Sequence, residues 1–532
     1  MIRDPAAAPA APIRWLDEVP DRWAKERPEA VALACAAGRF TWRDLVAARD
    51  GFARRLEALG VRAGDRVMVV GENCPAMVML VFAVTRLRAW VVNVNARLSG
   101  RELDVIREHS GARRVLFLLD DSPEAAAHAA RLRATGLDAT SWGAMAISPP
   151  ADAAAEPVTG DPQDDVAALL YTTGTTGSPK GVMLTHANLL FIARNSGQLR
   201  RIVPEDRVYG LLPVSHVYGL ASVALGTLLA GGAVCTQPRF APAASAAFIR
   251  HERLTVCQGV PAMYAKLLEH LKGRGENAFG ASALRFLYAG GSPLVPALKR
   301  EVEAFFGVRL HNGYGLTEAS PTLTQTRHDS PRDDCSVGPA IPGVSLRIVD
   351  RGGRDLPDGE IGELWARGPN VMKGYYRDPA ATAAAIHPGG WLATGDLARR
   401  EPEGAIHIEG RLKELIIRGG FNVLPLEVES VLNAHPAVTQ SAVVGRPANG
   451  DEEVVAFVEL APGATVAPAE LLEFAARALA PYKRPCEVIV LPALPAATSG
   501  KVLKAKLAQL ARETARKPGT DLEFRARSTT GG

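Results

Sequence analysis

Short apolar runs alternate with segments of helical periodicity through the first third of the chain. Each run is too short for a helix and is bounded by turn residues, which is typical of a buried strand. The first helical segment begins at Thr41 and Asp44, which resemble a capping box. The predicted strands are 66–71, 90–94 and 114–119, and the predicted helices are 41–59, 75–87 and 103–109. Such alternation predicts parallel sheets covered by helices.

The pattern changes twice further along the chain. Strands and helices alternate to Phe306, and Gly- and Pro-rich turns then separate short alternating runs between Val337 and Asp396, as in a small antiparallel or barrel-like subdomain. A boundary is expected at 410–414, beyond which the elements restart as a compact α+β domain of about 120 residues. We therefore predict an α/β protein with a large N-terminal domain over 1–410, a connection at 411–414 and a smaller C-terminal domain over 415–532.

Composition indicates a well-packed globular protein. At 532 residues the chain is too long for one core, so about two to four domains are expected. The net charge of +4 is small and argues against nucleic acid or a membrane surface as partner. The uncharged stretch 208–238 could cross a bilayer by length, but prolines and glycines divide it, which favours a buried strand, turn and helix.

The cysteines and the N-terminus bear on the compartment. The 6 cysteines lie far apart without metal-ligand spacing, so reduced thiols are expected. The first residues lack the long apolar core of a signal peptide. We expect a cytoplasmic protein, monomeric or homodimeric, without an integral membrane segment.

The stretch 171–186, YTTGTTGSPKGVMLTH, lies between the apolar runs 166–170 and 182–184. Because both runs are predicted strands, the polar stretch is a loop between them. Its glycines can expose backbone N–H groups, and the hydroxyls and Lys180 add donors, which together suit a phosphate. A proline before Lys180 rules out a Walker loop. A solvated linker is the alternative, but linkers rarely lie between two buried runs.

The segment 312–318, NGYGLTE, combines an aromatic ring, glycines and a carboxylate. Glycines on both sides of Tyr314 leave its ring beside backbone that a ligand can approach, so a purine could stack there. Thr317 and Glu318 follow, and Mg²⁺ bound to phosphates needs only one or two protein carboxylates. A strand-end turn with a packed tyrosine is the alternative.

Three single residues are further candidates. Asp396 follows a Thr-Gly turn, where a carboxylate can accept from both hydroxyls of a ribose, although most such aspartates are only turn residues. Lys501 lies at a turn before a helix and not on a plain helical face, although most lysines in such a basic tail are solvated. His216 lies among apolar residues, where a histidine is usually a hydrogen-bonded core residue, and no triad pattern surrounds it.

These segments resemble the adenylate-forming (AMP-binding) superfamily, which includes acyl-CoA synthetases, peptide-synthetase adenylation domains and luciferases. The similarity covers about residues 30–507, with YTTGTTGSPKG and four further motifs in the order and spacing of the family. It implies a two-step ligase, in which a carboxylate attacks the α-phosphate of Mg-ATP to give an acyl-adenylate and pyrophosphate, and a thiol then takes the acyl group. The C-terminal domain is implied to swing about a hinge at Lys413.

The resemblance also implies roles for individual residues. Those implied to bind ATP are Thr172, Thr173, Gly174, Thr175, Thr176, Gly177, Lys180, Asn312, Gly313, Tyr314, Gly315, Asp396 and Arg411. Those implied to be catalytic are Lys501, Thr317, Glu318, which also holds Mg²⁺, and His216, which gates the acid and thioester site. Those implied to line the acyl pocket, of a size for a flat or medium-sized acid, are Tyr218, Gly219, Tyr288, Gly290, Ser320 and Pro321. No cluster of arginines accompanies them, although Lys266 could reach a second carboxylate if it is not simply solvated.

Coenzyme A is the expected thiol. Gly419 and Gly420 in RLKELIIRGGFNV lie where the pantetheine channel of the family runs, and no carrier-protein domain follows. The matching segments GFNVLP and GPNVMKGYY favour fatty-acyl, malonyl or aryl acyl-CoA synthetases of bacterial type. Two alternatives stay open, a free-standing enzyme that loads a carrier protein and a nucleotide-binding protein that performs no ligation. The second is disfavoured, because it would need neither Glu318 nor Lys501.

Overall fold

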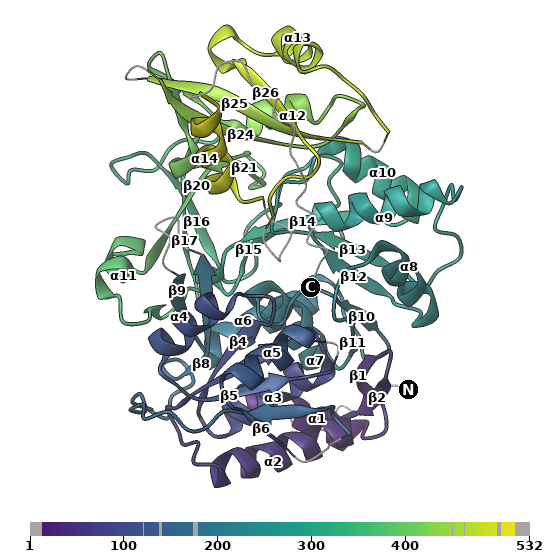
Figure 1. Ribbon diagram of the computed structural model, residues 1–532, viewed down its shortest axis with the longest axis vertical. Helices are drawn as coiled ribbons and strands as arrows, with labels where there is room; N and C mark the ends of the chain where they lie inside the picture. Colours follow the sequence, from purple (N-terminus) through teal and green to yellow (C-terminus); the bar gives the residue numbers. More distant parts are fainter. Residues whose placement is uncertain are drawn as a thin grey trace, which may run out of the picture. The chain divides into compact units, whose positions relative to one another are not determined.

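The computed structural model of the protein (Figure 1) describes residues 13–120, 122–137, 141–173, 179–448, 451–461, 463–496 and 502–515. These residues divide into two compact units, one ending at Ile408 and the other beginning at Glu409. The connection predicted at 411–414 therefore lies close to the division. Each unit is described by itself.

The first unit contains two large sheets, each with parallel strands at its centre and antiparallel strands at its edges. The first eight-stranded sheet has the spatial order β15 (Thr322–Gln325), β14 (Leu310–Gly315), β13 (Phe286–Ala289), β12 (Val256–Gly259), β10 (Arg207–Gly210), β11 (Ala233–Thr236), β1 (Val31–Cys35) and β2 (Gly38–Thr41). Only its edge strands β15 and β2 run antiparallel to their neighbours.

The second eight-stranded sheet has the spatial order β18 (Gly374–Tyr375), β9 (Pro179–Thr185), β8 (Val166–Thr173), β4 (Trp90–Asn95), β3 (Arg66–Gly71), β5 (Ala112–Leu118), β7 (Met145–Ile147) and β6 (Thr135–Gly136). β8, β4, β3 and β5 are parallel, as the sequence pattern predicts, and all six residues of β3 are buried. Burial on both faces explains why this strand is a continuous apolar run instead of an alternating one.

Helices fill the space between the two sheets and cover their outer faces. α3 is apolar on all sides and buried from Pro75 to Thr85, and it shares one core with Val234 of the first sheet and Val69 of the second. Figure 1 shows α8, α9 and α10 together along the first sheet, whose strands they bury. The helices are α1 (Val19–Glu26), α2 (Trp42–Ala58), α3 (Pro75–Arg86), α4 (Gly100–Ser110), α5 (Pro123–Arg131), α6 (His186–Leu199), α7 (Gly226–Ala230), α8 (Pro242–His251), α9 (Pro261–Gly273), α10 (Pro296–Phe306) and α11 (Pro379–Ala385).

Several local predictions are confirmed in this unit. The capping box is present, because Thr41 Oγ1 accepts from the N–H of Asp44 and the Asp44 carboxylate accepts from the N–H of Thr41. The stretch 208–238 contains most of β10, the π-helix η2 (Tyr218–Leu225), α7 and β11. Among the described helices, none combines the length and the apolar character that crossing a membrane requires. All the cysteines are free.

The glycine-rich part of the first unit forms a small antiparallel sheet, as its alternating runs predict. Its strands are β16 (Ser345–Val349), β17 (Gly362–Arg367), β20 (Trp391–Arg400) and β19 (Ile386–His387), and β21 (Ile406–Arg411) pairs with β20.

The second unit is a compact α+β arrangement. Its three-stranded sheet contains β24 (Val438–Ala448), β25 (Asp451–Leu460) and β26 (Glu487–Leu491), and a separate hairpin contains β22 (Ile416–Arg418) and β23 (Phe421–Val423). Its helices are α12 (Pro425–Leu432), α13 (Pro468–Ala478) and α14 (Lys504–Ala515). Val428 of α12 and Leu471 of α13 are fully buried in one core with Val454 of the sheet.

Candidate active site

The predicted phosphate loop joins two paired strands. β8 ends at Thr173 and β9 begins at Pro179, and the strands are antiparallel with Thr172 opposite Lys180. Both of these residues are half-buried at the end of the hairpin from which the loop leaves. The side chain of Thr173 and the whole of Gly174, Thr175, Thr176 and Gly177 lie outside the described residues, so their contacts with ATP stay predictions.

Tyr375 lies between Lys180 of the hairpin and Glu318. The Lys180 ammonium is 4.7 Å from the centre of the Tyr375 ring, and the Tyr375 hydroxyl donates to Oε1 of Glu318 at 2.7 Å. Burial and the neighbouring carboxylate raise the pKa of Tyr375, so the phenol keeps its proton and acts as a donor. Tyr375 was not predicted as a site residue, although GPNVMKGYY contains it. Its pairing with β9 through Val182 is what brings it to Lys180.

The backbone around Glu318 is fixed by the segment that leads to Tyr375. Glu318 lies in a short 3-10 helix, Thr317–Ala319, and its carbonyl accepts from the N–H of Met372 at 2.9 Å. The Asn370 amide donates to the carbonyls of Ala319 and Thr322 at 3.0 and 3.1 Å. These bonds explain how two segments far apart in sequence hold one carboxylate in place.

The Glu318 carboxylate fits a divalent cation. It is half-buried, and within the described part of the chain no lysine, arginine or histidine forms an ion pair with it. A half-buried carboxylate without a cationic partner is costly, and Mg²⁺ typically combines such a group with phosphate oxygens and water. The buried Thr317 precedes it.

Tyr314 and Asp396, predicted separately for adenine and ribose, are in contact. The Tyr314 hydroxyl donates to Oδ2 of Asp396. Asp396 is buried, with 3% of the residue exposed. The N–H of Asp396 donates to the hydroxyl of Thr394, which fixes the turn that carries the carboxylate. The two residues come from β14 and β20, so the end of the first sheet and the small sheet meet here.

The glycines beside Tyr314 are required by close packing. A Cβ on Gly313 would lie 2.0 Å from the Tyr288 hydroxyl, and one on Gly315 would lie 2.1 Å from the carbonyl oxygen of Pro321. Asn312 donates through its amide to the carbonyls of Cys335 and Ser336 at 3.0 and 3.2 Å. Its side chain therefore holds the neighbouring backbone.

The predicted acyl residues Tyr218, Tyr288 and Gly290 lie together. The two rings meet edge to face with centroids 6.0 Å apart. A Cβ on Gly290 would lie 3.3 and 3.5 Å from the Cε1 atoms of Tyr288 and Tyr218, so both rings pack closely on this glycine. Their role in binding the acyl group stays a prediction.

Other predicted acyl residues are committed to packing. Gly219 lies against the backbone of Pro213, where a Cβ would be 2.2 Å from the carbonyl oxygen. Ser320 is fully buried and donates to the carbonyl of Asn370 at 2.7 Å, and Pro321 is buried beside it.

His216 and Lys266 are both exposed. Nδ1 of His216 accepts from the N–H of Tyr218 at 3.3 Å, which holds the imidazole at the start of η2. Because His216 is exposed, it is not the hydrogen-bonded core residue that was the alternative interpretation. Lys266 lies on the solvent side of α9, in agreement with the alternative that it is simply solvated.

The second unit contains the remaining predicted residues. Arg411 is half-buried and Lys413 exposed, and Lys413 lies in a short 3-10 helix, Leu412–Glu414. Gly419 and Gly420 form the turn between β22 and β23, where both have positive φ, 59° and 78°. A two-residue hairpin turn of this kind strongly favours glycine. Lys501 lies outside the described residues.

A half-buried ion-pair group holds the start of α14 within the second unit. Lys504 lies 2.9 Å from Glu414 and 2.8 Å from Glu429. The two carboxylates raise the pKa of Lys504 although burial opposes them. The helix that begins next to Lys501 is thereby tied to the segment that follows Lys413.

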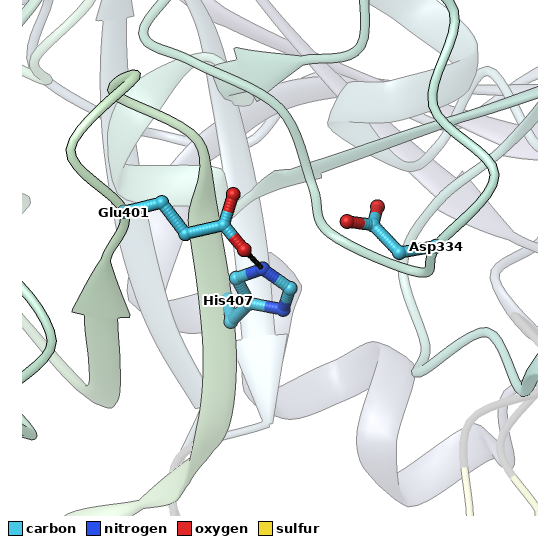
Figure 2. A group of neighbouring side chains, drawn as sticks. All are labelled: Asp334, Glu401 and His407. Carbon is cyan, nitrogen blue, oxygen red and sulfur yellow. Dashed lines mark hydrogen bonds and ion pairs between the residues drawn. The ribbon is translucent and has the colours of Figure 1, made fainter.

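Asp334, Glu401 and His407 form the one group of possible metal ligands found among the described residues (Figure 2). His407 Nε2 and Glu401 share a hydrogen bond of 2.7 Å, and Arg332 binds Asp334 and lies 2.7 Å from Glu401. The Arg332 hydrogen bond holds the pKa of Asp334 well below its usual value although burial opposes it. Because the guanidinium already supplies the positive charge, the group is an ion-pair network that fixes the loop.

Three comparisons with known proteins agree. Residues 20–376 match the family model described as AMP-binding enzyme, and residues 427–501 match the AMP-binding enzyme C-terminal domain. A feruloyl-CoA synthase of Amycolatopsis sp is 37% identical over 492 residues, which cover 92% of this chain and 97% of the relative.

Two solved structures are similar over most of their length. ATP-bound MatB from Rhodopseudomonas palustris has a TM-score of 0.81 and 33% identity, covering 94% of this chain and 99% of that one. The o-succinylbenzoate CoA synthetase MenE from Bacillus subtilis, in complex with the acyl-adenylate intermediate OSB-AMP, has a TM-score of 0.78 and 30% identity, covering 92% and 97%.

Proposed function

The chain belongs to the AMP-binding enzyme family and is an ATP-dependent acid–CoA ligase, and we propose that its acid is aromatic and that Glu318 holds the Mg²⁺ of the ATP complex. The reaction has two steps. The carboxylate first displaces pyrophosphate from ATP to form an acyl-adenylate, and the thiol of coenzyme A then displaces AMP to form the thioester.

The contact of Tyr375 with Lys180 and Glu318 carries the proposal for ATP. It brings a cation from the phosphate hairpin and a carboxylate suited to a metal to one side chain, 4.7 Å and 2.7 Å away respectively. Lys180 and the loop residues from Thr172 to Gly177 would hold the phosphates that leave as pyrophosphate. When bound, Mg²⁺ would neutralise phosphate charge as it develops on the leaving group.

The nucleoside would lie over the end of β14. Asn312 holds the neighbouring backbone, and the absence of Cβ atoms at Gly313 and Gly315 lets the strand lie close to Tyr288 and Pro321. The ring of Tyr314 would then support the adenine, and Asp396 and Arg411 would bind the ribose and phosphate.

An aromatic acid fits the residues proposed for the acyl pocket. Tyr218 and Tyr288 form an edge-to-face pair of rings beside Gly290, and aromatic rings pack favourably in such arrangements. The names of the relatives agree, because feruloyl and succinylbenzoate groups both contain a benzene ring.

The second unit would supply the remaining chemistry. Lys501 would bring the carboxylate and the α-phosphate together in the first step, since an ammonium offsets the repulsion between two anions. A rotation about Lys413 would then replace Lys501 with the Gly419–Gly420 turn. The pantetheine arm of coenzyme A would enter past this turn, and His216 would gate the acid and thioester site.

Pyrophosphate and thioester formation against a panel of acids test this proposal. We expect ATP-dependent thioester formation with substituted cinnamates or benzoates at a kcat/KM at least about 10-fold above that for straight-chain acids, since even one methylene lost from an apolar pocket costs roughly 1–3 kcal/mol. Straight-chain acids that react better than all aromatic acids would contradict the aromatic assignment. A carrier protein that discharges the adenylate when coenzyme A does not would favour the loading enzyme instead.

A further inference from the structure

Arg200 is a fully buried arginine next to the acyl residues. It follows α6 directly and is 0% exposed, whereas its sequence neighbour Arg201 is 56% exposed. Its guanidinium lies over the ring of Tyr288, 4.6 Å from the ring centre. Tyr288 is one of the two rings proposed to line the acyl pocket, so this cation lies directly behind the proposed pocket.

Most of the guanidinium is without a hydrogen-bond partner. Nη1 donates to the carbonyl of Ser222 at 2.9 Å, and the guanidinium also interacts with the side chain of Tyr288, but Nε and Nη2 complete no hydrogen bond among the described residues. These two nitrogens share one edge of the guanidinium plane, and their N–H groups point in the same direction. An edge of this kind can donate to both oxygens of a carboxylate.

No acidic side chain of the described part of the chain forms an ion pair with Arg200. Asp206, the nearest buried acid along the sequence, is bound to Arg285 and to Thr255, at 2.9 and 2.7 Å. An arginine buried without an anion costs several kcal/mol, and a bound anion would offset that cost. The contact with Tyr288 offsets only part of that cost.

Further unpartnered polar groups surround the same ring. Gln258 is 1% exposed, and neither its amide nitrogen nor its oxygen has a partner in the described structure. It is the register partner of Tyr288 across β12 and β13, so the two side chains lie on one face of the sheet. The hydroxyl of Tyr218 is also buried without a partner. Buried donors and an acceptor without partners therefore lie around the two rings proposed for the acyl pocket.

We propose that Arg200 binds a second anionic group of the substrate, so that the preferred acid carries a negative charge remote from the carboxylate that is activated. This inference rests on the proposed function, because the activated carboxylate must be at the phosphates and leaves Arg200 to another group. Gln258 and the Tyr218 hydroxyl would donate to the same anion. The positively charged Lys266 does not take this role, because it is exposed on α9.

A pair of acids that differ only in charge tests the inference. The probes are 4-carboxycinnamate and 4-carbamoylcinnamate, in which a neutral amide replaces the second carboxylate, and the measurement is kcat/KM for AMP release with coenzyme A. For the wild type we expect a preference of roughly 10- to 100-fold for the charged acid, the range for a hydrogen-bonded charged group. Arg200→Met should reduce this ratio to about one, and Arg200→Lys should retain part of it, because an ammonium lacks the two-pronged geometry.

Arg201→Met is the matched control. It replaces the neighbouring arginine, whose side chain is exposed to solvent, and should leave the ratio of kcat/KM for the two acids unchanged. The ratio is unaffected by a general loss of active enzyme, so a merely structural role of Arg200 would lower both rates equally. An unchanged preference in Arg200→Met would overturn the inference. So would a wild-type enzyme that uses the neutral acid as well as the charged one, and that result would leave the proposed function intact. If no aromatic acid supports AMP release, both the inference about Arg200 and the proposed function are wrong.

Discussion

The hydroxyl of Tyr375 donates a 2.7 Å hydrogen bond to the carboxylate of Glu318. The ring of the same tyrosine contacts Lys180, whose ammonium lies 4.7 Å from the ring centre. Tyr375 belongs to the second large sheet and Glu318 follows a strand of the first. One side chain therefore links the two sheets at the place where phosphate and metal are proposed to bind.

Tyr375→Phe should slow adenylate formation. The ring beneath Lys180 is kept, but the donor that orients Glu318 is lost, which is worth about 1.5–3 kcal/mol for a charged acceptor, or roughly 10- to 150-fold in rate. We also expect a higher concentration of Mg²⁺ for half-maximal pyrophosphate release, because the carboxylate is less well held.

The neighbouring Tyr376 provides the control for this variant. Its hydroxyl donates to Glu156, away from Glu318, so Tyr376→Phe should leave the magnesium dependence unchanged. Equal magnesium curves for the wild type and Tyr375→Phe would contradict a role of Tyr375 at the metal.

Lys501→Ala should abolish adenylate formation and largely spare the second step. The lysine is proposed to act on the carboxylate and the α-phosphate, which are present only while ATP reacts. Pyrophosphate release reports the first step, and thioester formation from preformed acyl-adenylate reports the second. Normal carboxylate-dependent pyrophosphate release by the variant would show that another group performs this task.

Lys413→Pro should have the opposite effect. Fixing φ at this residue restricts the rotation proposed for the second unit, so adenylation should survive while thioester formation falls. The same two assays measure it. Equal loss in both steps would remove the argument for a hinge at Lys413.

Lys504→Met should destabilise the second unit by on the order of 3 kcal/mol, because it leaves Glu414 and Glu429 without their cation. Chemical unfolding of the full chain, followed by a probe in this unit, measures the loss. The exposed Lys506 gives a matched control, since Lys506→Met removes the same charge from the same helix. Equal stability of the two variants would contradict a structural role of the Lys504 ion pairs.

Acid should destabilise the first unit through His186. Burial, together with the charge of Arg88, lowers the pKa of this histidine to about 4 in the folded protein, below the value of 6.5 for a free side chain. The unfolded chain thus binds more protons between these values, and the free energy of unfolding falls as pH is lowered from 6.5 to 4, by up to about 1.4 kcal/mol per pH unit.

His186→Asn should flatten this dependence. Nδ1 of His186 accepts from the N–H of Leu16 at 3.2 Å, and an asparagine oxygen can accept there without titrating. His251→Asn, at a histidine whose side chain is 78% exposed, serves as control. Unfolding curves of the wild type and His186→Asn with the same pH slope would exclude His186 as the cause.

Much of the fold follows from local pattern. The continuous apolar run of β3 predicts a strand buried on both faces, and the Thr41 and Asp44 pair predicts the start of α2 within one residue. These features depend on residues within a few positions of each other. Local pattern alone does not identify the site residues, which are predicted from the family resemblance. The need for glycine at Gly313 and Gly315, for example, depends on residues distant in the sequence that pack against them.

The features that sequence could not predict depend on distant contacts. Arg200 and Arg201 are adjacent and chemically identical, yet the first is buried because it meets the ring of Tyr288 and the second lies in solvent. Tyr375 reaches Glu318 from another sheet. Periodicity along the chain contains no information on either contact, since both are set by how the strands pair.

A single-turnover experiment tests the two-step reaction most directly. Enzyme in excess is mixed with labelled ATP, Mg²⁺ and an aromatic acid without coenzyme A, the mixture is quenched, and the bound acyl-adenylate is quantified; coenzyme A is then added to a second portion. We expect about one acyl-adenylate per labelled ATP consumed, stable until coenzyme A converts it to thioester and AMP. Thioester formation without any acyl-adenylate, or an adenylate that coenzyme A does not discharge, would contradict the assignment.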